Sequence, residues 1–252
     1  KQKRVGVDGP LHPTSLSAKS IQDILPQISQ LRRRKDRDEV AMIKRVIAAT
    51  EKAYWYAYDH LRAGVDETEL FAGMLGAAAA DCGEIIGECG NDFQIGGMGG
   101  PPRRRDAQHG EMAILDLSVR LRGYYSDMCR SFVVDREPNE AQKTAHERVL
   151  QVLGDVARRI KPGVSCKELF NLAHKELDGF RGWSFPHHLG HGVGLNGHEG
   201  PRLNPHWDDV LEPGNVIAVE PGLYGPDLRV GLRIEQIYLV TEHGADMLTS
   251  FP

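Results

Sequence analysis

Four carboxylates of this 252-residue chain lie in apolar stretches that are typical of buried β-strands. Asp116 and Asp127 lie on two neighbouring expected strands, and Glu220 and Glu235 lie in two apolar runs nearer the C-terminus. Any one of these carboxylates alone could cap the end of a strand or form a surface ion pair. Four carboxylates in apolar strands, two in each half of the chain, are hard to explain as four separate cases of this kind. Buried carboxylates are costly and repel one another unless cations neutralise them. Two divalent ions roughly 3.5–4 Å apart would neutralise this set.

A glycine-rich segment over 185–199 contains four of the eleven histidines, namely His187, His188, His191 and His198. Imidazole is a metal ligand or an acid–base group, and glycine permits close backbone approach, so the clustering favours a functional site over structural histidines. The segment includes a GxGxxG pattern, but the strand–helix–strand context of a dinucleotide site is missing. The chain has no GxSxG, P-loop or HExxH motif. The expected nucleophile is therefore water and not a side chain.

The elements expected to carry these residues occur twice in the same order, two helices followed by two strands. Apolar spacing and capping residues predict the first set at 36–64, 66–80, 112–119 and 125–134. The second set is predicted at 138–160, 165–177, 216–220 and 233–240. The stretch 83–102 is rich in glycine and is expected to be irregular. The repeated order predicts two similar halves that face one another.

Composition places the chain among ordinary globular proteins, with 40% hydrophobic and 26% charged residues. The formal net charge of -4 argues against a nucleic-acid or anionic-membrane binder. The basic run 32–35 is interpreted as a solvated helix entrance, because acidic residues follow it. The four cysteines include no CxxC pair and are interpreted as free thiols. The N-terminus leads into no long apolar stretch, so a cytoplasmic protein is expected.

The chain resembles the family of creatinase, methionine aminopeptidase, prolidase and aminopeptidase P, whose members share the pita-bread fold. The resemblance rests on ordered motifs, namely Asp116-Leu117-Ser118, Tyr125-Ser126-Asp127, His188-Leu189-Gly190-His191-Gly192-Val193-Gly194, His198-Glu199, Val219-Glu220-Pro221-Gly222-Leu223-Tyr224 and Gly231-Leu232-Arg233-Ile234-Glu235. The Glu-Pro-Gly-Leu-Tyr motif and the ending 248–252 are more similar to the Xaa-Pro branch.

The resemblance implies an α+β fold, with two pseudo-symmetric α-α-β-β halves around a curved antiparallel sheet. It covers about residue 31 to the end, so residues 31–252 are expected to be a pita-bread catalytic domain. Residues 1–30 are interpreted as the remnant of an N-terminal domain or a linker.

The resemblance also implies two divalent metal ions and the residues that hold them. Asp116 and Asp127 are expected to bind metal, with Asp127 bridging the two ions. His191 and Glu220 would serve the second ion, and Glu235 would be the other bridge. The oxygen-rich ligands and the family favour Mn²⁺ or Co²⁺, with Zn²⁺ as a further option.

The activity implied is hydrolysis of the N-terminal peptide bond of a short Xaa-Pro peptide by a metal-bound hydroxide, as an aminopeptidase or a dipeptidase. His187 and His198 correspond to family histidines that contact the substrate and stabilise the tetrahedral intermediate. Glu220 is expected to carry the proton to the leaving nitrogen. Arg233 is expected behind the metal ligands and near the substrate.

Two departures from the family pattern bear on specificity and assembly. The Xaa-Pro branch has a histidine in a Pro-His context upstream of the first aspartate, whereas this chain has no histidine in that region, Gly99-Gly100-Pro101-Pro102-Arg103-Arg104-Arg105. The strictness of the proline preference therefore stays open. Branch members also have a whole N-terminal domain, and its loss would leave apolar surface that favours a homodimer.

Three alternatives remain open at the level of the sequence. One is a catalytically idle peptide-binding homologue of the same fold, and another is a creatinase-like C–N hydrolase that works without metal. The five matching ligand positions argue against both, because neither needs to keep four buried carboxylates. The third alternative is a methionine aminopeptidase, which a peptide beginning with methionine would reveal.

Overall fold

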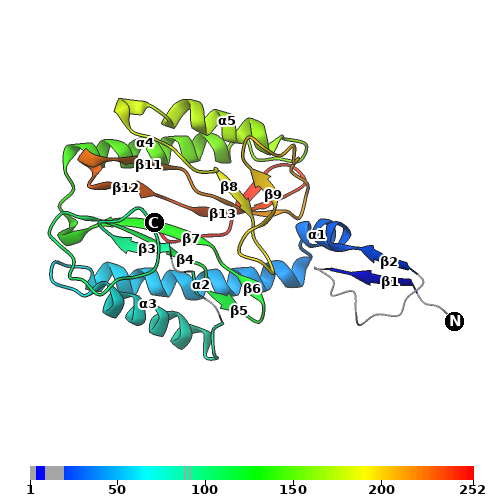
Figure 1. The fold of residues 1–252 in the computed structure, drawn as a ribbon, viewed down its shortest axis with the longest axis horizontal. Coiled ribbons are helices and arrows are strands. Elements are labelled where there is room, and N and C mark those ends of the chain that lie inside the picture. Colours follow the sequence, from blue (N-terminus) through cyan, green and yellow to red (C-terminus); the bar gives the residue numbers. More distant parts are fainter. Residues whose placement is uncertain (1–3, 9–19, 88, 91) are drawn as a thin grey trace.

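Two pairs of helices enclose a layer of mostly antiparallel strands, with α2 and α3 on one side and α4 and α5 on the other (Figure 1). The computed structural model describes residues 4–8, 20–87, 89–90 and 92–252. The part of the N-terminal prediction that falls on residues 1–3 and 9–19 lies outside this description.

The first half follows the predicted order of two helices and then strands. Its elements are α2 (Arg37–His60), α3 (Glu67–Cys82), β3 (Asp92–Ile95), β4 (Met112–Leu117), β5 (Arg120–Leu121), β6 (Tyr124–Tyr125) and β7 (Met128–Val133). Strands β3, β4 and β7 form a three-stranded antiparallel sheet in that order, and β5 pairs with β6 in a small hairpin. In this register Asp116 of β4 lies opposite Asp92 and Cys129.

The second half repeats the pattern with more strands. Its elements are α4 (Glu140–Ala157), α5 (Cys166–Leu177), β8 (Gly190–Gly192), β9 (Glu199–Leu203), β10 (Val216–Val219), β11 (Gly222–Gly225), β12 (Val230–Arg233), β13 (Gln236–Val240) and β14 (Ala245–Met247). Five of them form a sheet in the order β14-β13-β10-β8-β9, and β11 and β12 form a separate hairpin. Single turns of 3₁₀ helix lie at Val134–Arg136, Phe180–Gly182 and Pro226–Leu228.

Side-chain caps define where the long helices begin. The Asp36 side chain accepts hydrogen bonds from the N–H groups of Asp38 and Glu39. In turn, the Asp36 N–H donates a hydrogen bond to the Glu39 carboxylate. Asn139 and Gln142 form the same reciprocal pair at the start of α4. These caps satisfy backbone N–H groups that lack a partner within the helix. They explain why the sequence located the helix starts to within a few residues.

Three strand predictions are wrong in detail. The predicted strand 125–134 is divided into β6 and β7, with Ser126 and Asp127 between them. The predicted strand 233–240 is divided, because Ile234 and Glu235 leave the hairpin ladder and donate backbone hydrogen bonds to Pro221 and Cys129. The stretch 83–102 contains strand β3, which was predicted to be irregular. A strand of only four residues between glycines is too short for its alternation of apolar and polar residues to be recognised in the sequence.

Each pair of helices covers its own apolar core. One core packs α2 and α3 on β3, β4 and β7, and the Tyr54 hydroxyl within it donates to the Leu115 carbonyl at 2.9 Å. The other packs α4 and α5 on β10 and the β11–β12 hairpin. Burial of apolar surface on both sides of the strand layer is the main stabilising contribution. The strand ends between the two cores are therefore held firmly enough to position a site.

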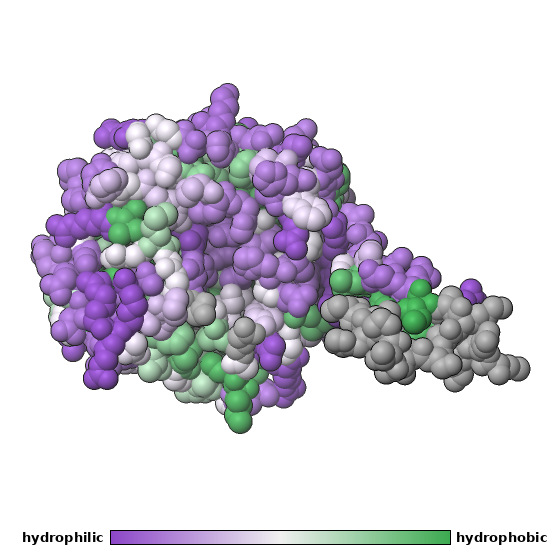
Figure 2. Space-filling model, in the orientation of Figure 1, coloured by the Kyte–Doolittle hydropathy of each residue, from purple (hydrophilic) through white to green (hydrophobic). Residues whose placement is uncertain are grey.

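The N-terminal segment projects from one end of the molecule (Figure 1). Strand β1 (Arg4–Val7) pairs in parallel with β2 (Ser20–Asp23), and α1 (Leu25–Arg33) follows. Figure 2 shows a largely hydrophilic face on the main body and hydrophobic residues on this projection. Exposed apolar side chains there include Ile21, Leu25 and Leu31.

The basic run 32–35 was predicted to be solvated, and this is wrong for two of its residues. The Lys35 ammonium is buried and lies 2.5 Å from a carboxylate oxygen of Glu199. The Arg33 guanidinium lies 2.7 Å from Asp209. Both partners lie more than 160 positions further along the chain, so local charge patterning does not reveal them. Among the described residues, no helix is long and apolar enough to cross a membrane.

Candidate metal centre

All eight residues singled out by the sequence line one pocket of about 360 Å³ between the two halves. They are Asp116, Asp127, His187, His191, His198, Glu220, Arg233 and Glu235. Asp116 lies on β4, His191 on β8 and Arg233 at the end of β12. The others lie in short connections directly beside strands, where the backbone turns away from its ladder. Both halves therefore contribute to one site.

Strand β8 lies between β10 and β9 and holds His191 close to both neighbours, because glycines flank this residue. A Cβ atom at Gly190 would lie 2.0 Å from the Ala218 carbonyl oxygen, and one at Gly192 would lie 2.2 Å from that of Gly200. No side chain fits at either position, so only glycine lets β8 lie this close to its neighbours. The glycines seen in the sequence around His191 thus have a packing cause.

Asp127 directs one carboxylate oxygen to a hydrogen bond and leaves the other without one. Its Oδ1 atom accepts a bond from the Ser118 hydroxyl at 2.5 Å, which fixes the orientation of the carboxylate. Its Oδ2 atom is buried and lies 3.6 Å from Nε2 of His191. The free oxygen therefore points toward the second half of the molecule.

His191 is held so that one ring nitrogen faces the carboxylates. Its Nδ1 atom lies 3.1 Å from the carbonyl oxygen of Gly192, which favours a proton on Nδ1 and a lone pair on Nε2. That Nε2 atom lies 3.4 Å from Oε1 of Glu220. Ligand atoms from Asp127, His191 and Glu235 all lie within 4.8 Å of one another. This orientation of an imidazole is the usual one at metal sites.

The donor atoms at the centre of the pocket fit divalent cations. Among the described residues, buried polar atoms without a hydrogen-bond partner include Asp127 Oδ2, Glu220 Oε1, Glu235 Oε2 and His188 Nε2. A buried carboxylate oxygen without a partner is costly, and a bound cation compensates for it. Carboxylate oxygen and imidazole nitrogen are also the ligand types that Mn²⁺, Co²⁺ and Zn²⁺ accept. The residues present therefore fit a two-metal site.

Burial, and to a smaller extent mutual repulsion, raises the pKa values of three of the acids. Burial raises the pKa of Asp116 to about 8, although the Arg233 guanidinium partly opposes this. Burial likewise raises the pKa of Asp127 to about 6, and it raises the pKa of Glu235 well above its usual range. For Glu220, burial is outweighed by contacts with His188 and His191, which hold its pKa well below the usual range. Such values mark a carboxylate cluster in need of positive charge.

The two histidines predicted to contact substrate border the same pocket. Nε2 of His187 lies 2.9 Å from the Tyr224 hydroxyl, and burial lowers its pKa. The His198 ring stacks on His191 with centroids 3.6 Å apart, and it is more exposed than its neighbour. Burial and the nearby His191 lower the pKa of His198 to about 4, so its ring is neutral near pH 7.

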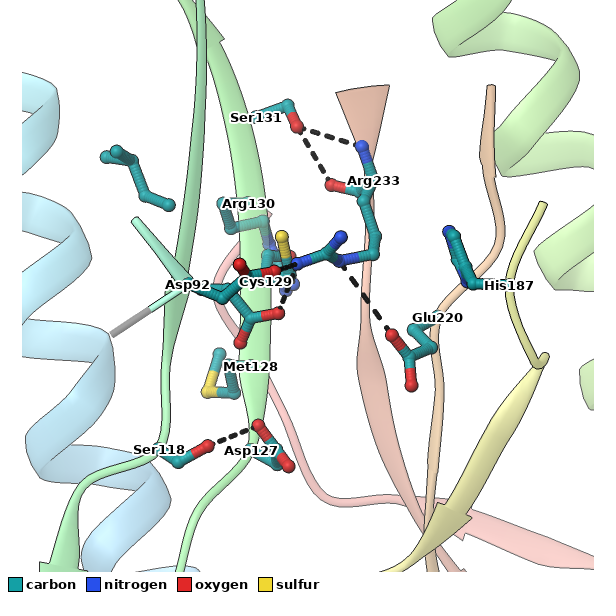
Figure 3. A network of polar contacts seen from close by, with 12 residues as sticks. Asp92, Ser118, Asp127, Met128, Cys129, Arg130, Ser131, His187, Glu220 and Arg233 are labelled. Atoms are coloured by element: carbon teal, nitrogen blue, oxygen red, sulfur yellow. Dashed lines mark hydrogen bonds and ion pairs between the residues drawn. The ribbon is translucent and has the colours of Figure 1, made fainter. Parts of the chain in front are cut away.

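Arg233 links the two halves at the rear of the pocket (Figure 3). Its Nη2 atom lies 2.6 Å from both Asp92 and Asp116, and its Nη1 atom donates to the Tyr224 hydroxyl at 3.1 Å. The backbone of Arg233 exchanges hydrogen bonds with the Ser131 hydroxyl on β7. A planar guanidinium suits such a multiple contact, and it holds the Asp116 carboxylate in place.

Three further side chains of the pocket were given no individual role by the sequence. Ser118 orients Asp127, Asp92 pairs with Arg233, and Nε2 of His188 lies 2.8 Å from Glu220. Ser118 and His188 lie within quoted motifs, so their neighbourhood was a usable signal. Asp92 gave no such signal, because its strand was predicted to be irregular.

The arginines in the region that lacks this histidine bind other parts of the protein. Arg103 Nη2 lies 3.1 Å from Glu67, and Arg103 donates to the Ile95 carbonyl. Neighbouring Arg105 pairs with Glu111 at 2.9 Å. Both guanidinium groups therefore form ion pairs with carboxylates of the protein itself.

Comparison with known proteins agrees with this geometry. The profile of metallopeptidase family M24 matches residues 41–242. The chain is 34% identical over 238 residues to a Xaa-Pro dipeptidase of Pyrococcus furiosus, covering 92% of this chain and 66% of the relative. It therefore spans about two thirds of the length of that relative.

Comparison with solved structures also finds Xaa-Pro peptidases. A prolidase from Pyrococcus horikoshii superposes with a TM-score of 0.89 at 29% identity, covering 99% of this chain and 75% of that one. An X-Pro aminopeptidase from Thermotoga maritima superposes with a TM-score of 0.84 at 27% identity, covering 94% of this chain and 67% of that one. The chain belongs to metallopeptidase family M24. The predicted family, α+β pita-bread fold and class of enzyme are thereby confirmed.

Proposed function

We propose that this chain is the catalytic region of a two-metal peptidase that cleaves the N-terminal peptide bond of short Xaa-Pro peptides. The observation that carries the proposal is the convergence of buried carboxylate oxygens without partners in one pocket. The names of the relatives, Xaa-Pro dipeptidase and prolidase, support the choice of substrate. The four free cysteines agree with the expected cytoplasmic location, which stays a prediction.

Five residues would hold the two ions: Asp116, Asp127, His191, Glu220 and Glu235. Asp127 and Glu235 are the proposed bridges between them. When bound, the ions supply Lewis-acid polarisation of the scissile carbonyl and an activated water. Mn²⁺ is the proposed metal because most of the ligand atoms are carboxylate oxygens.

The protein's own groups supply the proton transfers and the charge stabilisation. Glu220 has a low pKa, so it is ionised near pH 7 and can take a proton from the attacking water. It then passes this proton to the leaving nitrogen, which in a prolyl imide bond has no hydrogen of its own. His198 is neutral and can donate an N–H to the developing oxyanion.

The remaining pocket residues position these groups and the substrate. His187 is held between Tyr224 and the backbone of His188, so its ring keeps one orientation at the pocket wall. Arg233 holds Asp116, and its direct contact with substrate stays a prediction. The proposal also includes a domain boundary, with residues 31–252 as the catalytic domain. It further includes a homodimer that forms through the exposed apolar side chains of the N-terminal projection.

The test is hydrolysis of a peptide panel by chelator-stripped protein, before and after addition of Mn²⁺, Co²⁺ or Zn²⁺. The panel contains Xaa-Pro dipeptides, longer Xaa-Pro peptides and a peptide that begins with methionine. Metal-dependent cleavage after the first residue, lost in Asp127→Ala and kept in the exposed control Asp246→Ala, would support the proposal. Metal binding without turnover would favour an idle homologue, and turnover by stripped protein would favour a creatinase-like hydrolase.

A further inference from the structure

His188 brings an additional imidazole to the pocket, beside the five proposed metal ligands. Its Nε2 atom lies 2.8 Å from Oε1 of Glu220, and Nε2 of His191 lies 3.4 Å from that same oxygen. Nitrogen atoms of His188, His191 and His198 lie within 4.8 Å of one another. Ligand atoms that share one ion are separated by roughly 3–3.5 Å when each lies about 2.1 Å from it. These spacings are close to those of a shared coordination sphere.

The close approach of His188 to Glu220 lacks the direction of a hydrogen bond. Both Nε2 of His188 and Oε1 of Glu220 are buried and have no hydrogen-bond partner among the described residues. At 2.8 Å this means that the N–H direction of His188 misses the Glu220 oxygen. Two buried donor atoms arranged in this way are left for a third group between them, and a cation satisfies both.

Ring geometry separates His188 from His198 as a ligand. Imidazoles on one ion diverge from it, so their centroids lie farther apart than their nitrogens. The rings of His188 and His191 have centroids 5.6 Å apart and an angle of 72° between their planes, which is compatible with this arrangement. His198 instead stacks on His191 with centroids 3.6 Å apart, so these two rings cannot both point at one ion. Since His191 is buried beside Asp127 and Glu220, it is His198 that is left for the substrate.

We propose that His188 is a sixth ligand, which gives the ion beside Glu220 a set with two imidazoles. This inference rests on the proposed two-metal function. The two ion positions then differ, because Asp116, Asp127 and Glu235 offer only oxygen to the other ion. Imidazole suits Zn²⁺, Co²⁺ and Fe²⁺, whereas carboxylate oxygen suits Mn²⁺ and Mg²⁺. The chain is therefore expected to take two different metals from a mixture.

The test measures the ligands of the metal itself, using Co²⁺ as the probe. Chelator-stripped protein is loaded with two equivalents of Co²⁺, and imidazole scattering is measured by X-ray absorption. The wild type should show an average of one imidazole per ion, and His188→Gln should show half of that. His198→Gln and the exposed control His243→Gln should keep the wild-type value. In a calorimetric titration, His188→Gln should weaken one of the two binding steps by at least ~100-fold.

The outcomes separate failure of this inference from failure of the proposed function. Wild-type protein that binds two Co²⁺ ions with only half an imidazole per ion would overturn the role of His188, and this result needs no variant. A loss of affinity in His188→Gln with unchanged imidazole scattering would also overturn it, and His188 would then merely orient Glu220. Wild-type protein that binds no Co²⁺ would instead contradict the two-metal function.

Discussion

Two groups of buried carboxylates in this molecule differ in their surroundings. Glu67 at the start of α3 is fully buried and accepts hydrogen bonds from the Ile95 N–H at 3.1 Å and the Arg103 N–H at 2.7 Å. The Arg103 guanidinium adds a charged contact. At the candidate metal centre, by contrast, Asp127 and Glu235 each keep a buried oxygen without a partner among the described residues. A satisfied carboxylate holds a loop in place, whereas an unsatisfied cluster holds a cation.

The largest effect is expected from removing a carboxylate of the unsatisfied cluster. Asp127→Ala should lower kcat/KM by at least ~1000-fold, because loss of the proposed bridging ligand would remove several kcal/mol of metal-dependent stabilisation. The metal-free variant should unfold at the same temperature as the wild type or higher, since one of several repelling charges is gone. Kinetics and thermal unfolding in chelator measure the two effects. A less stable metal-free variant would show that Asp127 is structural, as Glu67 is.

The next largest effect concerns the buried ion pair of Lys35 and Glu199. Lys35→Met leaves Glu199 buried without its cation, and we expect a loss of roughly 3–5 kcal/mol in the free energy of unfolding. The double variant Lys35→Met with Glu199→Gln should recover much of this loss, because no buried charge then stands alone. Urea unfolding of the single and double variants measures the coupling. Additive losses would mean that the pair has no mutual stabilisation.

Glu67→Ala should lower stability and leave metal affinity nearly unchanged, which is the opposite of what is expected for Asp127→Ala. It leaves the Ile95 and Arg103 N–H groups without their acceptor, which costs about 1–3 kcal/mol for each buried group. Metal affinity, measured by calorimetry, should stay within about threefold of the wild type, since Glu67 lies outside the pocket lining. Glu69→Ala in the same first helical turn is the matched control. Loss of metal binding in Glu67→Ala would mean that the two carboxylate sites are not independent.

The smallest expected effect is a pH dependence of the metal-free protein. The pKa of Asp116 is about 8 in the folded protein against an ordinary value of 3.8, so the folded state binds its proton more tightly. This contribution to stability is complete at low pH and is lost as the pH rises toward 8. The pKa of His191, raised to about 9, acts in the same direction above pH 6.5. Between pH 6.5 and 8 the unfolding temperature in chelator should therefore fall, by roughly 2–4 °C per kcal/mol lost.

Added Mn²⁺ should remove or reverse the fall of the unfolding temperature between pH 6.5 and 8, because metal ions bind the deprotonated ligands. Asp116→Asn in chelator should reduce this pH dependence to the part that His191 contributes. Differential scanning calorimetry at pH 6.5 and 8 measures all three cases. A metal-free protein that gains stability toward pH 8 would contradict the picture of repelling acids.

Several features followed from the sequence because their cause is local. Helix starts depend on caps such as Asp36 and Asn139, which act on the next few residues. The glycines around His191 and the carboxylates in apolar runs marked a site before any fold was known. The family motifs then implied a role for each residue, and the roles of the individual residues stay predictions.

Other features were missed because they depend on contacts between distant segments. Strand β3 is fixed by its pairing with β4, and the chain at Ile234 and Glu235 is turned by hydrogen bonds to the first half. Nothing near Lys35 in the sequence indicates that it is buried against Glu199.

The sequence by itself determined the family, the order of the helices and the kinds of residue available to hold metal. Those properties are carried by residue type, periodicity and short motifs, which need only neighbouring positions. Only the tertiary structure decided which oxygen of Asp127 stays free, that Arg233 holds Asp116, and that His188 approaches Glu220. Each of these depends on how two separately packed halves meet, and that is set by burial of their cores and not by any local pattern.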